Sequence, residues 1–196
     1  MTGRTAVLAL HYQNEVLHPD GKIRLGVPEG ASGRAAVVDA ARRLLAGARG
    51  AGIPVVHVRI AFAPGHGEVV VNAPIFRNVV ALRACEEGSW GAAFHDGLEP
   101  RPGEAIVTHH RVNAFYESGL EQQLRGLGAD RLILAGVATN SVVEHTARHA
   151  VDMGYEIVLA ADACSAGRAD LHRAALDNVA LLGEVSTVGA LFPAAP

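Results

Sequence analysis

The sequence predicts an α/β protein, a three-layer α/β/α sandwich whose mostly parallel, doubly wound sheet is covered by helices on both faces. Two observations predict this fold. Short runs of adjacent apolar residues recur along the 196 residues, as expected of parallel strands that are buried on both faces. Between the runs lie segments with apolar residues at helical spacing. Regular strand–helix alternation indicates right-handed βαβ units and therefore a parallel sheet.

Six apolar runs are the expected strands. Each is four to seven residues long and most are rich in β-branched residues, which suits a buried strand. The expected strands are Ala6–Leu10, Pro54–Ile60, Ala105–Thr108, Arg131–Ala135, Glu156–Ala160 and Glu184–Val188.

Four helices are expected between these strands, each from an apolar stripe at spacings of three and four residues. The first stripe runs from Val37 to Ala48 and stops at Gly50 and Gly52. The third runs from Val142 to Val151, with Asn140 as the expected N-cap. The second and fourth stripes are Leu120, Leu124, Leu127 and Leu171, Ala175, Val179, Leu182.

A loop-rich insertion interrupts the alternation at about residues 62–102, where prolines and glycines are frequent. Loops of this length inside a compact domain usually have a function. Because we find no repeat, linker or low-complexity tract, we expect one domain over residues 1–196.

Composition narrows the function further. Apolar residues make up 49% of the chain, charged residues 19%, and the formal net charge is -3, which argues against disorder and gives no electrostatic case for nucleic acid or membrane as a partner. We see no signal peptide or membrane span and expect a cytoplasmic protein. Lys22 is the one lysine, and Cys85 and Cys164 are the two cysteines.

A ligand site is expected where the strands end. In open parallel sheets, ligands bind beyond the carboxyl ends of the strands, near the point where the strand order reverses. His11 follows the first strand, His109 follows the third, and Gly136–Val142 links the fourth strand to a helix N-terminus, which favours negative charge.

These segments resemble the isochorismatase-like superfamily of cysteine hydrolases. The matching residues are the Gln13-Asn14 pair, Gly88-Ser89-Trp90-Gly91-Ala92, the segment Thr108–Phe115, and above all Leu134–Arg148, which contains Gly136-Val137-Ala138-Thr139. The match extends over most of the chain in order and spacing, and it implies the fold described above.

The resemblance also implies a catalytic triad of aspartate, lysine and cysteine, and all three positions differ here. They hold His11, His109 and Val142. Since valine has no nucleophilic atom, a thiolate at that position is impossible. By resemblance, the backbone N–H groups of Ala138 and Val142 would hold an oxyanion beside a cis Val137–Ala138 peptide bond.

Two histidines in place of an acid and a base leave both positions titratable near neutral pH. We therefore expect a cofactor-independent hydrolase, or a related enzyme cleaving a C–O or C–N bond of a small molecule, with His11 and His109 transferring protons. The alternative is an inactive homologue that only binds a ligand or has a structural role. Either form is expected to assemble into a dimer or a larger homo-oligomer, as members of the superfamily usually do.

The other expected site residues form the pocket walls. Aromatic walls with a few polar groups are typical of small-molecule pockets, and Arg111 could bind a substrate carboxylate or form a structural ion pair. No catalytic metal is expected, and His145 and His149 are expected to be an exposed pair. Cys164 could be a relocated nucleophile, although a small buried residue is the simpler interpretation. The expected substrate-binding residues are Tyr12, Gln13, Phe62, Trp90, Arg111 and Phe115.

Overall fold

The computed structural model describes residues 4–27 and 31–193. Its centre is a six-stranded sheet in the order β3-β2-β1-β4-β5-β6, and all five strand pairings are parallel. The expected parallel sheet is therefore confirmed. The strands are β1 (Thr5–Leu10), β2 (Val55–Ile60), β3 (Ala105–His109), β4 (Arg131–Gly136), β5 (Glu156–Ala160) and β6 (Glu184–Ser186).

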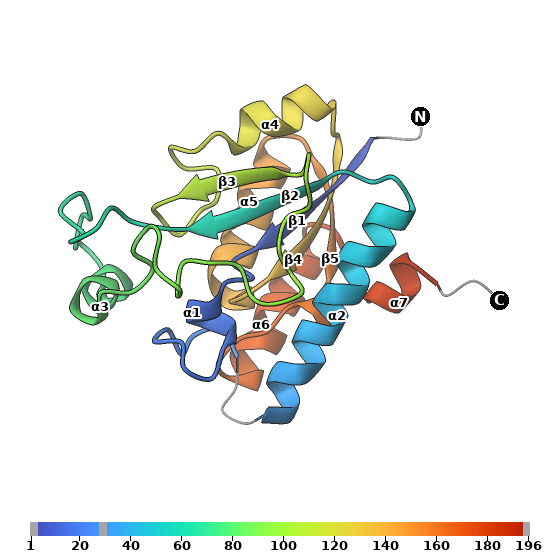
Figure 1. Cartoon of the computed structure of the whole chain (residues 1–196). Coiled ribbons are helices and arrows are strands. Elements are labelled where there is room, and N and C mark those ends of the chain that lie inside the picture. The colour runs from blue at the N-terminus through green and yellow to red at the C-terminus, as the bar shows by residue number, and fades with distance from the viewer. Residues whose placement is uncertain (1–3, 28–30, 194–196) are drawn as a thin grey trace.

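Helices cover both faces of this sheet (Figure 1). Helix α2 packs against α7 on one face, whereas α5 packs against α6 on the other. The helical elements are α1 (Asn14–Leu17), α2 (Ala31–Gly50), α3 (Pro74–Leu82), α4 (Leu120–Leu127), the π-helical turn η1 (Thr139–Val143), α5 (Glu144–Asp152), the 3₁₀ turn η2 (Ala161–Ala163), α6 (Ala169–Ala180) and α7 (Val188–Leu191).

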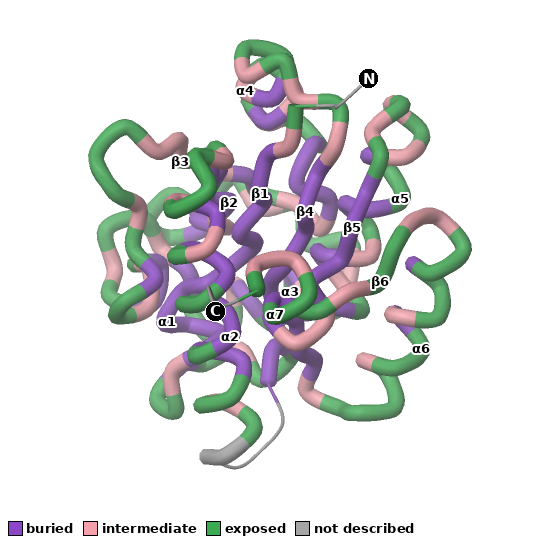
Figure 2. The backbone as a smooth tube through the Cα atoms, turned by 90° about the vertical axis from the view of Figure 1, so that its right-hand side faces the viewer, coloured by how far each residue is buried: buried purple, intermediate pink, exposed green. Residues whose placement is uncertain are grey.

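The core lies between the sheet and the helices. Figure 2 shows the central strands β1 and β4 buried along most of their length, while the outer sides of α4 and α6 are exposed. Burial on both faces explains why these strands are continuous apolar runs rather than alternating ones. No helix in the described part of the chain is long and apolar enough to cross a membrane.

Two local expectations were wrong. The sixth strand ends at Ser186 because Thr187 caps α7, its side-chain oxygen accepting a hydrogen bond from the backbone N–H of Ala190 at 3.3 Å. Asn140 is no N-cap, since the helical region already begins at Thr139 with a π-helical turn.

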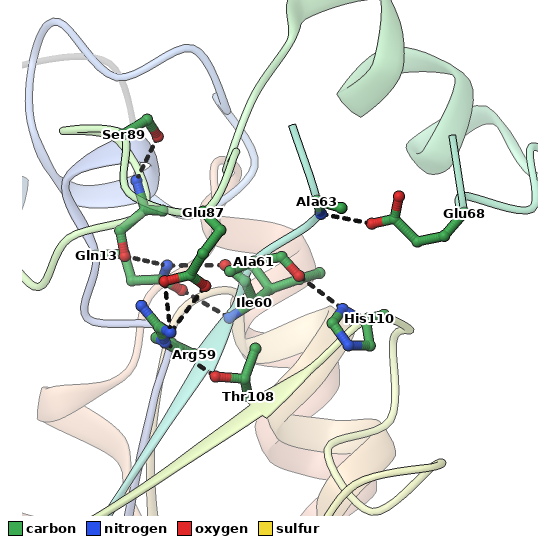
Figure 3. Close-up of polar contacts among 11 residues, drawn as sticks. Gln13, Arg59, Ile60, Ala61, Ala63, Glu68, Glu87, Ser89, Thr108 and His110 are labelled. Atoms are coloured by element: carbon green, nitrogen blue, oxygen red, sulfur yellow. Dashed lines mark hydrogen bonds and ion pairs between the residues drawn. The ribbon is translucent and has the colours of Figure 1, made fainter. Parts of the chain in front are cut away.

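The insertion at residues 62–102 is less irregular than expected, because it contains helix α3 with proline at its start. Polar contacts attach the insertion to the end of β2 (Figure 3). The Arg59 guanidinium donates to both carboxylate oxygens of Glu87 at 2.9 and 2.8 Å, and its Nε donates to the hydroxyl of Thr108 at 3.0 Å. The insertion therefore lies beside the carboxyl ends of β2 and β3.

Candidate active site

The candidate site lies at the carboxyl ends of β1 and β4, the neighbouring strands between which the strand order reverses. His11 directly follows β1 and has a φ of 56°, in the left-handed region that few non-glycine residues adopt. Gly136 ends β4 with a φ of 152°, and a Cβ there would lie 2.1 Å from the carbonyl oxygen of Leu10. Only glycine lets β4 pass this close to β1 before the chain turns.

A cavity of about 60 Å³ opens at this point. It lies between the β4 turn, the α1–α2 connection and helix α3, and its walls are mostly apolar. The lining residues are His11, Val16, Ile23, Leu25, Gly26, Ile60, Ile75, Phe76, Asn78, Val79, Cys85, Arg111, Val112, Val137, Ala138, Ser141 and Val142. Three of the predicted reactive positions, His11, Ala138 and Val142, are thus brought to one cavity.

The two predicted catalytic histidines contact each other directly. Nε2 of His11 lies 2.5 Å from Nε2 of His109, and the rings are stacked with centroids 4.8 Å apart. His109 is fully buried and does not line the cavity, whereas His11 does. One Nε2 must donate the hydrogen and the other must accept it, so the two tautomers are coupled.

Burial keeps both imidazoles neutral near pH 7. It lowers the pKa of His109 to about 4, against a smaller opposite effect from the backbone of Asn113. The pKa of His11 is also well below its usual value, first because of burial and second because of repulsion from a charged His109. Nδ1 of His109 has no hydrogen-bond partner within the described residues.

The turn after β4 forms one wall of the cavity. The Val137–Ala138 peptide bond is cis, as predicted. The backbone N–H of Thr139 donates to the carbonyl of Ser165 at 2.8 Å, whereas that of Ala138 has no partner in the described part of the chain. Val142 lies in the π-helical turn and contacts the cavity.

Arg111 lines the cavity in a fixed position. Its guanidinium carbon lies 3.6 Å from the centre of the Phe76 ring, a cation–π contact. Two of its nitrogens donate to the carbonyl of Val70 at 3.0 Å and to the side-chain oxygen of Asn72 at 2.8 Å. No carboxylate within residues 4–27 and 31–193 forms an ion pair with it, so the structural ion pair considered above is not found there.

Tyr12 and Gln13 do not line the cavity, although both were predicted as substrate-binding residues. The Tyr12 ring is buried in the core, where its hydroxyl donates to the carbonyl of Ala163 at 2.6 Å. The Gln13 amide joins three backbone groups, two of Ile60 and one of Ala92, at 2.8 to 2.9 Å (Figure 3). Gln13 therefore fixes β1 to β2 and to the insertion.

Three further predicted wall residues also lie outside the cavity. Phe62 packs in a small apolar cluster with Val79, and Phe115 is buried against the ring of His149. Trp90 is 52% exposed and meets the edge of the His18 ring. Aromatic residues close to strand ends in sequence thus pack in different directions, and none of these three lines the cavity.

Apart from Arg111, the side-chain walls of the cavity were not predicted from the sequence. Ile75, Phe76 and Val79 come from α3, and Ile23 and Leu25 come from the α1–α2 connection. The spacing of Ile75, Phe76 and Val79 is a helical signal after Pro74 that could have revealed α3. The α1–α2 connection carries no comparable signal.

The cysteines and the remaining histidines have clear places. Cys85 lines the cavity and Cys164 lies in the core, and burial raises the pKa of each thiol to about 12. His145 and His149 are exposed, as predicted. His57 is a buried histidine whose Nε2 lies 2.9 Å from a carboxylate oxygen of Glu104.

Within the described residues, no group of three or more His, Cys, Asp or Glu side chains is placed to share a metal ion.

Comparison with known proteins agrees with this geometry. A model of the isochorismatase domain family matches residues 5–190. The ureidoacrylate amidohydrolase RutB of Methylobacterium radiotolerans is 33% identical over 95% of this chain and 77% of its own. A maleamate amidohydrolase of Pseudomonas putida is 31% identical, covering 79% of this chain and 71% of its own.

Solved structures show the same fold. An isochorismatase family protein from Desulfovibrio vulgaris superposes with a TM-score of 0.85 at 26% identity, covering 97% of each chain. A cysteine hydrolase from Pseudomonas syringae gives a TM-score of 0.85 at 25% identity, covering 96% of this chain and 91% of that one. The chain therefore belongs to the isochorismatase family.

Proposed function

We propose that this protein hydrolyses an amide bond of a small organic acid, with water rather than a cysteine as the nucleophile and with His11 as the base. The observation that carries the proposal is the 2.5 Å contact between His11 and His109 at a cavity that Ala138 and Val142 also line. The amidohydrolases among the relatives support the reaction class.

The tautomers of the histidine pair suit a base. When His11 donates its Nε2 hydrogen to His109, its Nδ1 carries no hydrogen and is free to accept one. Nδ1 of His11 forms no hydrogen bond with the described residues, and its ring borders the cavity. The low pKa of both rings keeps them in the neutral form that a base requires.

The reaction then runs in two steps. The oxygen of a water molecule attacks the amide carbon, its proton passes to Nδ1 of His11, and the carbonyl electrons move to the oxygen. That oxyanion is held by the N–H groups of Ala138 and Val142. The C–N bond breaks as the oxyanion collapses, and His11 returns the proton to the leaving nitrogen. His109 fixes the tautomer and orientation of His11 throughout.

Arg111 would select an acid as substrate. Its guanidinium borders the cavity, is fixed over Phe76, and has no carboxylate partner within the described residues. A guanidinium has five N–H donors. The two hydrogen bonds of Arg111 to neutral oxygens use only some of them. A substrate carboxylate would take the remaining donors.

The two cysteines do not suit nucleophilic catalysis. Burial raises both thiol pKa values to about 12, so neither Cys85 nor Cys164 ionises appreciably near neutral pH. We expect a variant in which both are replaced by alanine to keep its amidase activity, provided that it folds. Loss of activity in a folded double variant would instead favour a thiol mechanism.

A second candidate function is ligand binding without turnover. It is favoured by the residues at the three triad positions implied by the family resemblance, because Val142 has no nucleophilic atom and His11 and His109 replace the aspartate and the lysine. The two candidates share the site and differ in whether a product appears.

The deciding experiment measures release of ammonia or amine from maleamate, ureidoacrylate and related small acid amides. We expect His11→Asn and His109→Asn each to lower kcat/KM by roughly 100-fold or more, the usual effect of a general base. His149→Asn, an exposed histidine outside the cavity, serves as the matched control. Unchanged turnover in both site variants would refute the histidine chemistry. Saturable binding without any product would favour the second candidate.

A further inference from the structure

A second hollow adjoins the reactive cavity. It has a volume of about 310 Å³ and is lined by Val112, Asn140, Ser141, Glu144, His145 and Arg148. We call it the polar shelf. Two of its residues, Val112 and Ser141, also line the cavity, so the shelf and the cavity meet along these two side chains.

The charged groups of the shelf are already paired. Glu144 accepts hydrogen bonds from Arg148 at 2.9 Å, one turn along α5, and from the side-chain amide of Asn178 at 3.0 Å. Because this pair leaves no net charge on the shelf, it provides little attraction for an ionic group.

Three other polar side chains of the shelf have free hydrogen-bonding capacity. Asn140, Ser141 and His145 make no side-chain hydrogen bond with any residue in the described ranges. An amide, a hydroxyl and an imidazole together offer both donors and acceptors. The shelf is therefore suited to a neutral group that hydrogen-bonds, such as a hydroxyl or a second amide.

The cavity by itself is too small for both halves of an amide. Its volume of about 60 Å³ accepts one short chain, and its walls there are apolar side chains such as Ile60, Phe76 and Val79. Arg111 lines the cavity but not the shelf. A carboxylate bound to Arg111 therefore places the acidic half of the substrate in the cavity, and the other half reaches the shelf past Ser141 and Val112.

We propose that the shelf is a second binding site for the substrate, and that the substrate is an N-substituted amide with a short acidic half in the cavity and a neutral, hydrogen-bonding amine half on the shelf. This inference rests on the proposed amide hydrolysis for the identity of the scissile bond. It adds that the leaving group is a polar amine rather than ammonia.

The test uses succinic acid monoamide and two derivatives that carry N-ethyl or N-(2-hydroxyethyl) groups. Calorimetry gives Kd for all three compounds, and product release gives kcat/KM. The hydroxyethyl compound is expected to bind roughly tenfold more tightly than the ethyl compound, the effect of one or two hydrogen bonds. Replacement of Asn140 or His145 by alanine should reduce that preference toward one. Gln122→Ala, an exposed change on α4, should keep it.

The outcomes separate this inference from the proposed function. A hydroxyethyl preference in Kd that depends on Asn140 and His145 would support the shelf as a substrate-binding site. If none of the compounds is then hydrolysed, only the proposed amidase activity fails. Three results would refute the proposal that the shelf binds the amine half of the substrate. They are equal Kd values for the three compounds, no binding of any of them, or a preference that persists in both alanine variants.

Discussion

Removal of the buried imidazole of His109 is expected to flatten the pH dependence of stability. The folded protein holds the pKa of this group at about 4, against a usual value of 6.5, because the ring is buried. Between these values the unfolded chain binds a proton that the folded protein excludes. The group's contribution is thus fully present above about pH 6.5 and is lost as the pH falls.

The size of the effect follows from the two pKa values. One group with this shift lowers the free energy of unfolding by about 2 kcal/mol between pH 7 and pH 5, and by about 3 kcal/mol at pH 4. His109→Phe keeps an aromatic ring in the site and cannot titrate. The variant should therefore lose about 2 kcal/mol less than the wild type on going from pH 7 to pH 5.

Urea unfolding followed by circular dichroism at several pH values measures this difference. His57 and His172, whose pKa values are also lowered by burial, remain in both proteins and cancel in the comparison. His11 also remains, but the variant lacks the repulsion from a charged His109 that helps to lower the pKa of His11, and this change acts in the same direction as the expected difference. His109→Gln serves as a second variant should the phenylalanine fail to fold. Equal losses of stability in wild type and variant would refute the reasoning, because His109 would then be no more protected from protonation than in the unfolded chain.

Three other predictions concern the same end of the sheet. Cys85 and Cys164, with thiol pKa values raised to about 12, should react with iodoacetamide at pH 8 only after unfolding, and rapid labelling of the native protein would contradict their burial. Gly136→Ala should destabilise the protein by about 2 kcal/mol or more in urea unfolding, because its φ of 152° and the nearby β1 carbonyl exclude a side chain. His172→Ala removes the 2.8 Å hydrogen bond to the hydroxyl of Thr139 in the turn after β4, and should lower kcat more than it raises KM. An unchanged kcat would show that the turn keeps its active geometry without this hydrogen bond.

Most of the sheet could be predicted because a buried parallel strand leaves a local signal. Continuous apolar runs such as Arg131–Ala135 are strands in the structure within a residue or two at each end. The sixth strand was predicted two residues too long, because Thr187 and Val188 look like strand residues until capping of α7 is taken into account. Helix α3 was missed because prolines and glycines surround it in the insertion.

The site could be predicted in part. Its place followed from the rule for open parallel sheets, and the structure puts His11, Ala138 and Val142 at one cavity. The aromatic walls could not be predicted, because the direction of a side chain after a strand depends on the local backbone. Tyr12 follows His11 directly but points into the core, toward Ala163.

The sequence by itself determined the strands, the turn at Gly136 and the loss of the lysine and cysteine that the family resemblance implies. These features depend on residue type and on neighbours along the chain. Only the tertiary structure decided that the two histidines, 98 positions apart, touch at 2.5 Å, and that Arg111 borders the cavity without an acidic partner in the described residues. Packing brings distant residues together, and burial then sets their charge. Neither the contact between such residues nor their charge state can therefore be predicted from the local sequence.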